Sequence, residues 1–404
     1  MNTQKIFLRA LVGIAVMANA VAMAAHSDDR NEPPPAELSS LAADQNAGRL
    51  EKVAEFHGPL VTGIAVSREG RIFVSFPRWT DPLQFTVGEL KNGEVQPYPD
   101  AAIQDQSLPP QDRLISVQSV VVDADNRLWL LDSGTVNQGP VIPFGAKLIA
   151  VDLNTNRVIR KIFFPDNVVL ANTYLNDVRF DLKLGQAGVA FISDSSPESG
   201  NAIIVVDLAT GQSYRRLAGH PTVRPVPDFL ATVEGRPLYN RPAPGQVQPF
   251  LTGVDGIAVS ADGNCLFYSP LSSRHLYSVD AQALADPSRS EADVESTVVD
   301  HGQKGTANDG METDDQGALY LTAFEHDAIL RRRPDGHYET VVHDPHLLWP
   351  DSMAISTDGY LYFTVNQLDR LPRFHDGHDL RRKPWVLFRT KIGAGPSLLA
   401  QPQR

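Results

Sequence analysis

The sequence has almost no cysteine, because Cys265 is the only one among 404 residues. A single thiol cannot close an intramolecular disulfide, build a cysteine-rich zinc or iron–sulfur centre, or attach haem through two sulfur atoms. Those classes of site are excluded. With 42% hydrophobic residues, a chain of this length can still bury a stable core without disulfide support.

Positive charge is also scarce. Lys and Arg number 36 against 48 Asp and Glu, which gives a formal net charge of −12. Such a chain repels a phosphate backbone and gains little from counterion release, so we expect no nucleic acid and no anionic membrane as a partner. The sequence also has no G-x-S-x-G elbow, no H-E-x-x-H pair and no phosphate-binding glycine loop, which excludes α/β-hydrolases, zincins and P-loop enzymes.

Long apolar runs are missing except near the start. Residues 10–21 are apolar, two basic residues precede them, and the small-residue triplet 22–24 follows. This order is typical of a secretory signal peptide, and the run is shorter than the roughly 20 residues that span a bilayer; an uncleaved anchor is the alternative. We expect a cleaved leader over residues 1–24, a flexible tether over residues 25–49, and a secreted or periplasmic protein.

What the sequence contains in quantity is one unit repeated six times. Each unit has a small or acidic opening residue, an alternating apolar strand, a tight turn and a second apolar strand. The units begin at Thr62, Gln118, Asn176, Asp255, Asn308 and Asp351. Alternation indicates half-buried strands, and turns such as Asp262-Gly263 place glycine where a hairpin needs positive φ.

Most of these hairpins are followed by a third strand, as in residues 147–152, 203–207 and 276–280, and then by a turn and a fourth strand. The unit is therefore a four-stranded antiparallel meander. The spacing between units fits propeller blades of roughly 40–50 residues with insertions. We predict an all-β fold, a six-bladed β-propeller over residues 50–395, with a C-terminal tail over residues 396–404.

A closed propeller must join its two ends. Residues 50–56 are a candidate strand that completes the blade containing residues 386–390, so the N- and C-terminal strands would close the ring. The longest interval between units holds a proline-rich insertion at residues 223–250, which we predict to be a long loop without strands. Two β-sandwich domains are the alternative architecture, but they do not explain the shared order of the six hairpins.

The opening residues are the candidates for function. The innermost strand of each blade runs along the central channel, so the residues just before these strands should converge at one mouth. They include Thr62 and, with carboxylate or amide side chains, Gln118, Asn176, Asp177, Asp255, Asn308, Asp309 and Asp351. A hard divalent cation with oxygen ligands would relieve their negative charge; calcium fits best, and magnesium and zinc are alternatives. Asp and Asn before strands also bind backbone N–H groups at turns, and that purely structural role stays open.

We expect a monomer that takes a small-molecule ligand or substrate at this mouth. Gln118, Asp177 and Asn308 are candidate ligand-binding residues. His326, after the second strand of its unit, is a further candidate as a ligand-binding residue or general base, and an exposed loop histidine is the alternative.

Five strings carry a resemblance to a known family. They are LWLLDSG (128–134), YLNDVRFD (174–181), AFISDSS (190–196), DGIAVSADGNCLFYSPLSSRHLYSV (255–279) and WPDSMAISTDGYLYFTVNQL (349–368). In this order they resemble the Yellow / major royal jelly protein family in its bacterial branch. The resemblance covers roughly residues 50–395 and implies a secreted six-bladed propeller; the insect members add an isomerase or oxidase of catechol-type compounds as one candidate activity.

A more distant similarity is to the gluconolactonase / senescence marker protein group, whose six-bladed propellers bind a divalent metal. Asn176, Asp255 and Asp309 match the later metal-binding positions of that group, while the segment 60–63 lacks its first-blade glutamate. The similarity implies a metal-dependent hydrolase of lactones. In such an enzyme the cation polarises the carbonyl group, and Asp309, with Asp351 second, activates water. A non-catalytic propeller that binds a small molecule is the alternative.

Overall fold

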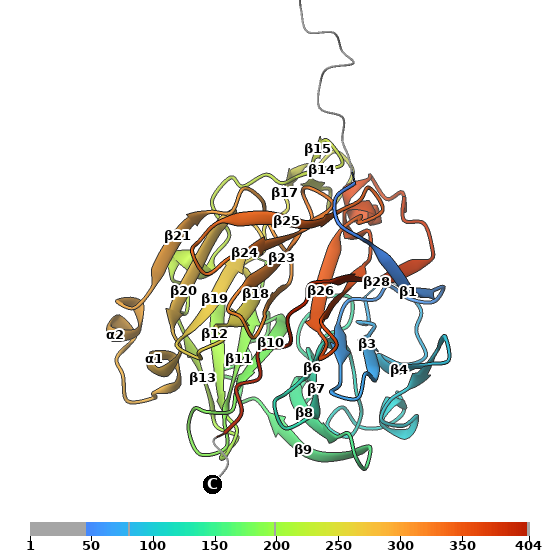
Figure 1. The fold of residues 1–404 in the computed structure, drawn as a ribbon. Coiled ribbons are helices and arrows are strands. Elements are labelled where there is room, and N and C mark those ends of the chain that lie inside the picture. Colours follow the sequence, from blue (N-terminus) through green and yellow to red (C-terminus); the bar gives the residue numbers. More distant parts are fainter. Residues whose placement is uncertain (1–45, 80, 198, 402–404) are drawn as a thin grey trace, which may run out of the picture. The chain divides into compact units, whose positions relative to one another are not determined.

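The computed structural model describes residues 46–401 apart from 80 and 198, and these form six four-stranded antiparallel sheets (Figure 1). The predicted all-β, six-bladed propeller is confirmed. The predicted leader over residues 1–24 and most of the predicted tether lie outside the described residues.

The blades are numbered in chain order, and the strands of each blade run from the channel outward. Blades 1 to 3 consist of β2 (Ile64–Val66), β3 (Ile72–Ser75), β4 (Val87–Lys91) and β5 (Glu94–Pro97); β6 (Val117–Val122), β7 (Arg127–Asp132), β8 (Lys147–Asp152) and β9 (Arg157–Phe163); and β10 (Leu175–Asp181), β11 (Val189–Asp194), β12 (Ala202–Asp207) and β13 (Ser213–Arg216).

Blades 4 to 6 repeat this order. They consist of β18 (Val254–Val259), β19 (Cys265–Pro270), β20 (His275–Asp280) and β21 (Val299–Gln303); β22 (Met311–Thr313), β23 (Leu319–Ala323), β24 (Ala328–Arg332) and β25 (Tyr338–His343); and β26 (Pro350–Ile355), β27 (Tyr360–Val365), β28 (Trp385–Lys391) and β1 (Glu51–Phe56).

The inner strands form a closed ring, because β2, β6, β10, β18, β22 and β26 contact one another in this order and β26 contacts β2. The hydrophobic core lies between neighbouring blades. One cluster joins blades 2 and 3, where the Trp129 and Phe180 rings stack 4.9 Å apart, and another joins blades 3 and 4. Sheets that are covered on both faces explain why middle strands such as β11 and β12 are almost entirely buried.

The ring is closed as predicted. β1 pairs with β28 in antiparallel register, with Glu51 opposite Arg389 and Phe56 opposite Trp385. Glu51 and Arg389 also form an ion pair at 3.0 Å. The N-terminal strand is thereby the outer strand of the last blade, and both chain ends of the propeller are held in one sheet.

The proline-rich insertion differs from the prediction. Residues 223–250 contain two short hairpins instead of a strandless loop, because the prolines occupy edge positions where no ladder N–H is needed. The hairpins are β14 (Thr232–Val233) with β15 (Arg236–Pro237), and β16 (Tyr239–Asn240) with β17 (Gln248–Pro249).

The helical elements of the described residues are short. They are α1 (Ala281–Ala285) and α2 (Glu291–Glu295), and the 3-10 helices η2 (Ala102–Gln104), η3 (Pro221–Val223), η4 (Leu368–Arg370) and η5 (Pro372–Phe374). None of the helices in the described part of the chain combines the length and the apolarity needed to cross a bilayer.

The C-terminal tail packs against the propeller at the hairpin-turn end of the inner strands. Pro396 forms a bridge with Asp314 of blade 5, and the Leu182 N–H donates to the Leu399 carbonyl oxygen at 2.9 Å. Leu399 is buried in the core between blades 3 and 4. The tail therefore links the last blade to blades on the other side of the ring.

Ring closure gives a first prediction. Phe56 of β1 is buried, faces Trp385 in the register and packs edge-on against Phe76 of blade 1 at 6.0 Å. We expect Phe56→Ala to lower the free energy of unfolding by about 3–5 kcal/mol, since a large core side chain is lost where two blades meet. Denaturant unfolding would measure this. The control Ile159→Ala, at a position that is 53% exposed, should change the free energy by less than about 0.5 kcal/mol.

Candidate functional site

A cavity of about 420 Å³ opens at the end of the channel where the inner strands begin. Five of the predicted opening residues line it: Gln118, Asn176, Asp255, Asp309 and Asp351. Its walls come from the loops between strands and include Trp79, Tyr174, Phe250, Leu271, Leu368 and Arg373. The predicted convergence of opening residues at one mouth is confirmed for these five. We call Asp255, Asp309 and Asp351 the acidic floor.

A β-bulge turns the opening residues toward the channel. In blades 2, 3, 4 and 6 the pairing of the first two strands shifts by one residue at the opening position, for example between Val117 and Ser119, where Gln118 is the extra residue. The same shift occurs at Asn176, Asp255 and Asp351. Since a bulge re-aims the side chain of the extra residue, the repeated bulge builds the ring of polar groups.

Glycine brings the inner strands close together. A Cβ atom on Gly256 would lie 2.2 Å from the Asp309 carbonyl oxygen, and one on Gly310 would lie 2.5 Å from the Asp351 carbonyl oxygen. Only glycine tolerates such an approach of one backbone to another. The glycine after an acidic opening residue therefore sets how closely the carboxylates of neighbouring blades meet.

A chain of hydrogen bonds crosses the cavity from blade 2 to blade 5. Gln118 Nε2 donates to Asn176 Oδ1 at 3.0 Å, and Asn176 Nδ2 donates to Asp255 Oδ2 at 2.7 Å. The Asp255 and Asp309 carboxyl groups lie within reach of each other, and a proton on either group would let them share a hydrogen bond. Trp349 Nε1 donates to Asp309 Oδ2 at 2.8 Å, from a residue held at a φ of +57°, which is uncommon for a large side chain.

Asp351 lies outside this chain of hydrogen bonds and has partners of its own. Its carboxylate accepts hydrogen bonds from Ser352 Oγ at 3.0 Å and from Asn366 Nδ2. Burial first, and then repulsion from the neighbouring carboxylates, raises the pKa of Asp255, Asp309 and Asp351 well above the ordinary value. Within the described residues, no Lys, Arg or His forms an ion pair with these three groups. The floor therefore lacks positive charge.

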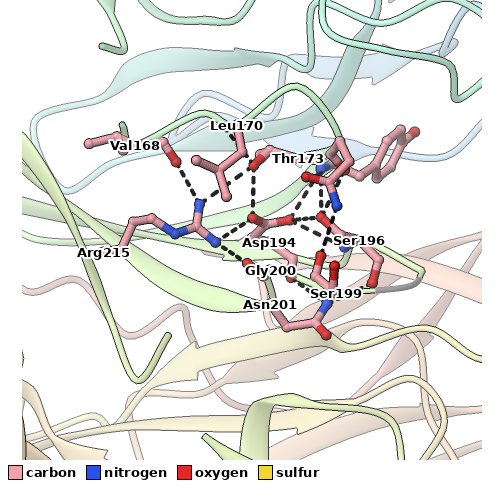
Figure 2. Close-up of polar contacts among 11 residues, drawn as sticks. Val168, Leu170, Thr173, Asp194, Ser196, Ser199, Gly200, Asn201 and Arg215 are labelled. Carbon is pink, nitrogen blue, oxygen red and sulfur yellow. Dashed lines mark hydrogen bonds and ion pairs between the residues drawn. The ribbon is translucent and has the colours of Figure 1, made fainter. Parts of the chain in front are cut away.

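One wall of the cavity is fixed by a buried carboxylate at the end of β11. Figure 2 shows the Asp194 side chain among Arg215, Thr173 and Ser196. Arg215 Nη2 donates to Asp194 Oδ2 at 2.7 Å, Thr173 Oγ1 donates to the same oxygen at 3.0 Å, and the backbone N–H of Tyr174 donates to Oδ1 at 3.2 Å. This network holds the loop that carries Tyr174 into the cavity.

The Tyr174 hydroxyl joins Trp79 of the wall to the opening residue Gln118. It donates to Gln118 Oε1 at 2.8 Å and accepts from Trp79 Nε1 at 2.8 Å. Burial raises the pKa of Tyr174, so the phenol stays protonated at neutral pH. Trp79 and Tyr174 thus form a rigid aromatic side to the cavity.

Three predicted site residues do not line the cavity. Asp177 pairs with Arg179 at 2.6 Å and accepts from Ser119 Oγ at 2.9 Å. Asn308 is fully buried, with Nδ2 donating to the Asp309 carbonyl oxygen at 3.0 Å and Oδ1 without a partner among the described residues. His326 is exposed and contacts the Gly305 carbonyl oxygen through Nε2 at 3.1 Å. Their roles in ligand binding stay predictions.

The side chains at the floor determine whether a cation would fit there. No group of three or more His, Cys, Asp or Glu side chains among the described residues is placed to hold a metal ion. The predicted ligands Asn176, Asp255 and Asp309 include only two side chains of those types, and they are consecutive in the hydrogen-bond chain. All their donor atoms are hard oxygens, which suits calcium or magnesium better than zinc. By the type of their donor atoms, these residues fit a divalent cation.

Sequence reasoning missed the residues of the walls. Trp79, Phe250 and Arg373 lie in loops with no strand periodicity, so no sequence pattern placed them at the channel mouth. The recurring strings LWLLDSG and AFISDSS could have indicated one structural feature of the site. Their aspartates, Asp132 and Asp194, occupy the same position at the end of a second strand.

The acidic floor gives a pH-dependent prediction. A carboxyl group whose folded pKa is raised stabilises the fold only at low pH, and this contribution is lost as the pH rises through the raised pKa. Asp309→Asn keeps an acceptor for Trp349 and donates to Asp255. With a chelator present, we expect this variant to exceed the wild type in stability by about 1–3 kcal/mol at pH 8, and the difference to vanish near pH 4.

Chemical denaturation across this pH range would measure the difference. Asp166→Asn, which changes an exposed carboxylate on a loop, is the control and should give the same difference at every pH. If Asp309→Asn is less stable than the wild type at pH 8, the three carboxyl groups of the floor do not destabilise the fold through unpaired charge.

Comparison with known proteins identifies the family. The family model described as Major royal jelly protein matches residues 115–382. Major royal jelly protein 7 of Apis mellifera is 31% identical over 226 residues, which are 52% of this chain and 46% of that protein. Protein yellow of Drosophila guanche is 27% identical over 242 residues, which are 55% of this chain and 39% of that protein. The matches thus span less than half the length of these curated relatives.

Among solved structures, a gluconolactonase from Xanthomonas campestris superimposes with a TM-score of 0.50 at 12% identity, covering 85% of this chain and 89% of that one. At this identity the likeness shows the fold alone. The family match covers blades 2 to 5 and the first two strands of blade 6, including all five opening residues that line the cavity. The chain belongs to the major royal jelly protein family.

Proposed function

We propose that this protein is an exported hydrolase of lactone-type small molecules, with its active site in the central cavity. The observation that carries the proposal is the acidic floor: three buried carboxyl groups of raised pKa face one cavity with aromatic walls and the volume of a small ligand. Perturbed carboxyl groups in a concave, largely apolar pocket are typical of catalytic sites. The leader predicted over residues 1–24 supports export.

Asn176, Asp255 and Asp309 would hold a divalent cation, with calcium favoured by the hard oxygen donors. When bound, such a cation supplies the positive charge that the floor lacks and polarises a substrate carbonyl group. A proton on Asp255 or Asp309 would take the place of that charge when no cation is bound. Cation binding should therefore release protons from the floor.

The general base is best assigned to Asp351. Asp309 and Asp351 both fit this role by position, but a carboxylate that holds a cation is a weaker base. Asp351 has no hydrogen bond to the proposed cation ligands and is oriented by Ser352 and Asn366. Its raised pKa makes it a stronger base toward the proton of an attacking water than an ordinary carboxylate is.

Binding without turnover is the second candidate function. It is favoured by Thr62, which occupies the first-blade opening position and offers no carboxylate to a cation. Its hydroxyl instead donates to the Gln118 carbonyl oxygen at 3.2 Å. With only two carboxylates and one amide, the cation would depend on water or on the ligand for its remaining bonds.

Elemental analysis and a hydrolysis assay test the proposal together. We expect about one equivalent of calcium in the purified protein, and hydrolysis of glucono-δ-lactone or γ-butyrolactone that a chelator abolishes. Asp255→Ala should lose the metal and lower kcat/KM roughly 100-fold or more, because even loss of an outer-shell partner costs about 10–100-fold. The matched control is Asp262→Ala, in the exposed turn of the same blade, which should keep both.

The outcomes separate the two candidate functions. A protein that takes up calcium but hydrolyses no lactone would favour ligand binding without turnover. A protein that neither binds calcium nor hydrolyses these lactones when calcium is added would overturn the hydrolase proposal.

A further inference from the structure

Among the described residues that line the cavity, Arg373 is the one group whose charge is opposite to that of the acidic floor. It lies in η5. Its Nη1 donates to Gln138 Oε1 at 2.9 Å, and its buried Nε has no hydrogen-bond partner among the described residues. No described carboxylate forms an ion pair with it. The guanidinium therefore faces the cavity with donor capacity that this part of the chain leaves unused.

Two other arginines of the same loop do have carboxylate partners. Arg370 forms an ion pair with Glu234, and Arg381 pairs with Asp81 at 3.0 Å. An acidic protein with 48 Asp and Glu has carboxylates available for its arginines. The fold places one beside each of those two neighbours and none beside the arginine that lines the cavity.

Two aromatic rings fix the guanidinium in place. The Arg373 Cζ lies 4.8 Å from the ring centroids of both Phe250 and Phe374, and these rings meet edge-on at 5.1 Å. Phe250 comes from the proline-rich insertion and lines the same cavity. An arginine stacked on rings keeps its in-plane N–H donors available, and a fixed fork loses little entropy when it binds an anion.

The electrostatic cost of this arrangement calls for an anion. Burial lowers the pKa of Arg373 to about 10, so the group is still charged at neutral pH. A half-buried charge without a counterion is unfavourable, and an anionic group in the cavity would offset that cost. One guanidinium matches one negative charge. A phosphate ester, with nearly two, would meet uncompensated repulsion from the acidic floor.

We propose that Arg373 is the anion-recognition residue of the cavity and that the substrate carries a carboxylate, which pairs with this guanidinium while the cyclic ester meets the acidic floor. This inference rests on the proposed function and narrows the substrate class to carboxylate-bearing lactones. The planar fork of arginine suits a carboxylate, which it binds through two parallel hydrogen bonds.

Calorimetric titration of the full-length protein with two matched probes tests the inference without turnover. The probes are 3-phenylpropanoate and 3-phenylpropanamide, which differ only in the charged group. We expect the carboxylate to bind at least about 10-fold more tightly, the gain typical of a charge-assisted hydrogen bond. Arg373→Met should remove the preference, since it keeps an apolar stem between the rings but no donor, and Arg373→Lys should retain part of it.

Arg382→Met is the control, because Arg382 is exposed and lines a different surface cleft. It should leave the preference unchanged. Equal binding of the two probes to the wild type overturns the inference, as does the absence of carboxylate binding up to about 10 mM. A preference that persists in a folded Arg373→Met variant overturns it too.

The binding result and the hydrolase result can fail separately. A carboxylate preference that depends on Arg373, in a protein that hydrolyses no lactone, supports this inference and contradicts the proposed hydrolysis. Hydrolysis of neutral lactones without any carboxylate preference supports the proposed hydrolysis and contradicts this inference.

Discussion

The candidate site depends on a buried carboxylate at the end of the second strand of a blade. In blade 2, Asp132 accepts the backbone N–H groups of Ile115 and Ser116 at 2.8 and 2.9 Å and pairs with Lys147 at 2.9 Å. In blade 3, Asp194 does the same for the loop before β10, with Arg215 as its cation. Each carboxylate ties the loop that precedes an inner strand to the middle of its own blade. Removal of one partner would leave a buried charge and unpaired N–H groups, a combination that destabilises proteins strongly.

The inner strands and the long loops bring opposite charges to one cavity. The inner strands supply carboxyl groups through bulges, and the longer loops supply aromatic rings and Arg373. Because the ring of six blades is closed, the floor cannot relax by moving one blade away from another. Charge at the floor can therefore be relieved only by protonation or by a cation or ligand that binds there. A backbone that is already in place loses little entropy when such a species binds.

The sequence predicts the regular part of this arrangement and not the irregular part. Alternation of apolar residues located the strands well, so that β8 occupies residues 147–152 as expected, and β1 closes the ring. A bulge of one residue leaves that alternation almost unchanged, which is why the turning of opening side chains such as Asn176 and Asp255 into the channel could be expected only from topology. The residues of the cavity walls could not be predicted from the sequence. Trp79 meets Tyr174, 95 residues away, through an indole–phenol hydrogen bond between two loops that have no periodic pattern.

Aspartate has two different roles at neighbouring positions of these blades, and the difference lies in the cation beside it. Asp132 pairs with Lys147 on the next strand, β8, and Asp194 pairs with Arg215 on β13, the outermost strand of its sheet, so the charge of both is neutralised within the fold. Asp177 has Arg179 two residues later. The carboxyl groups of the floor, from Asp255 to Asp351, have no such partner in the described part of the chain. Since the same fold supplies cations to the first group, their absence at the floor is a local property of the cavity. The unpaired carboxyl groups of the floor can therefore interact with a positively charged ion or molecule from solution.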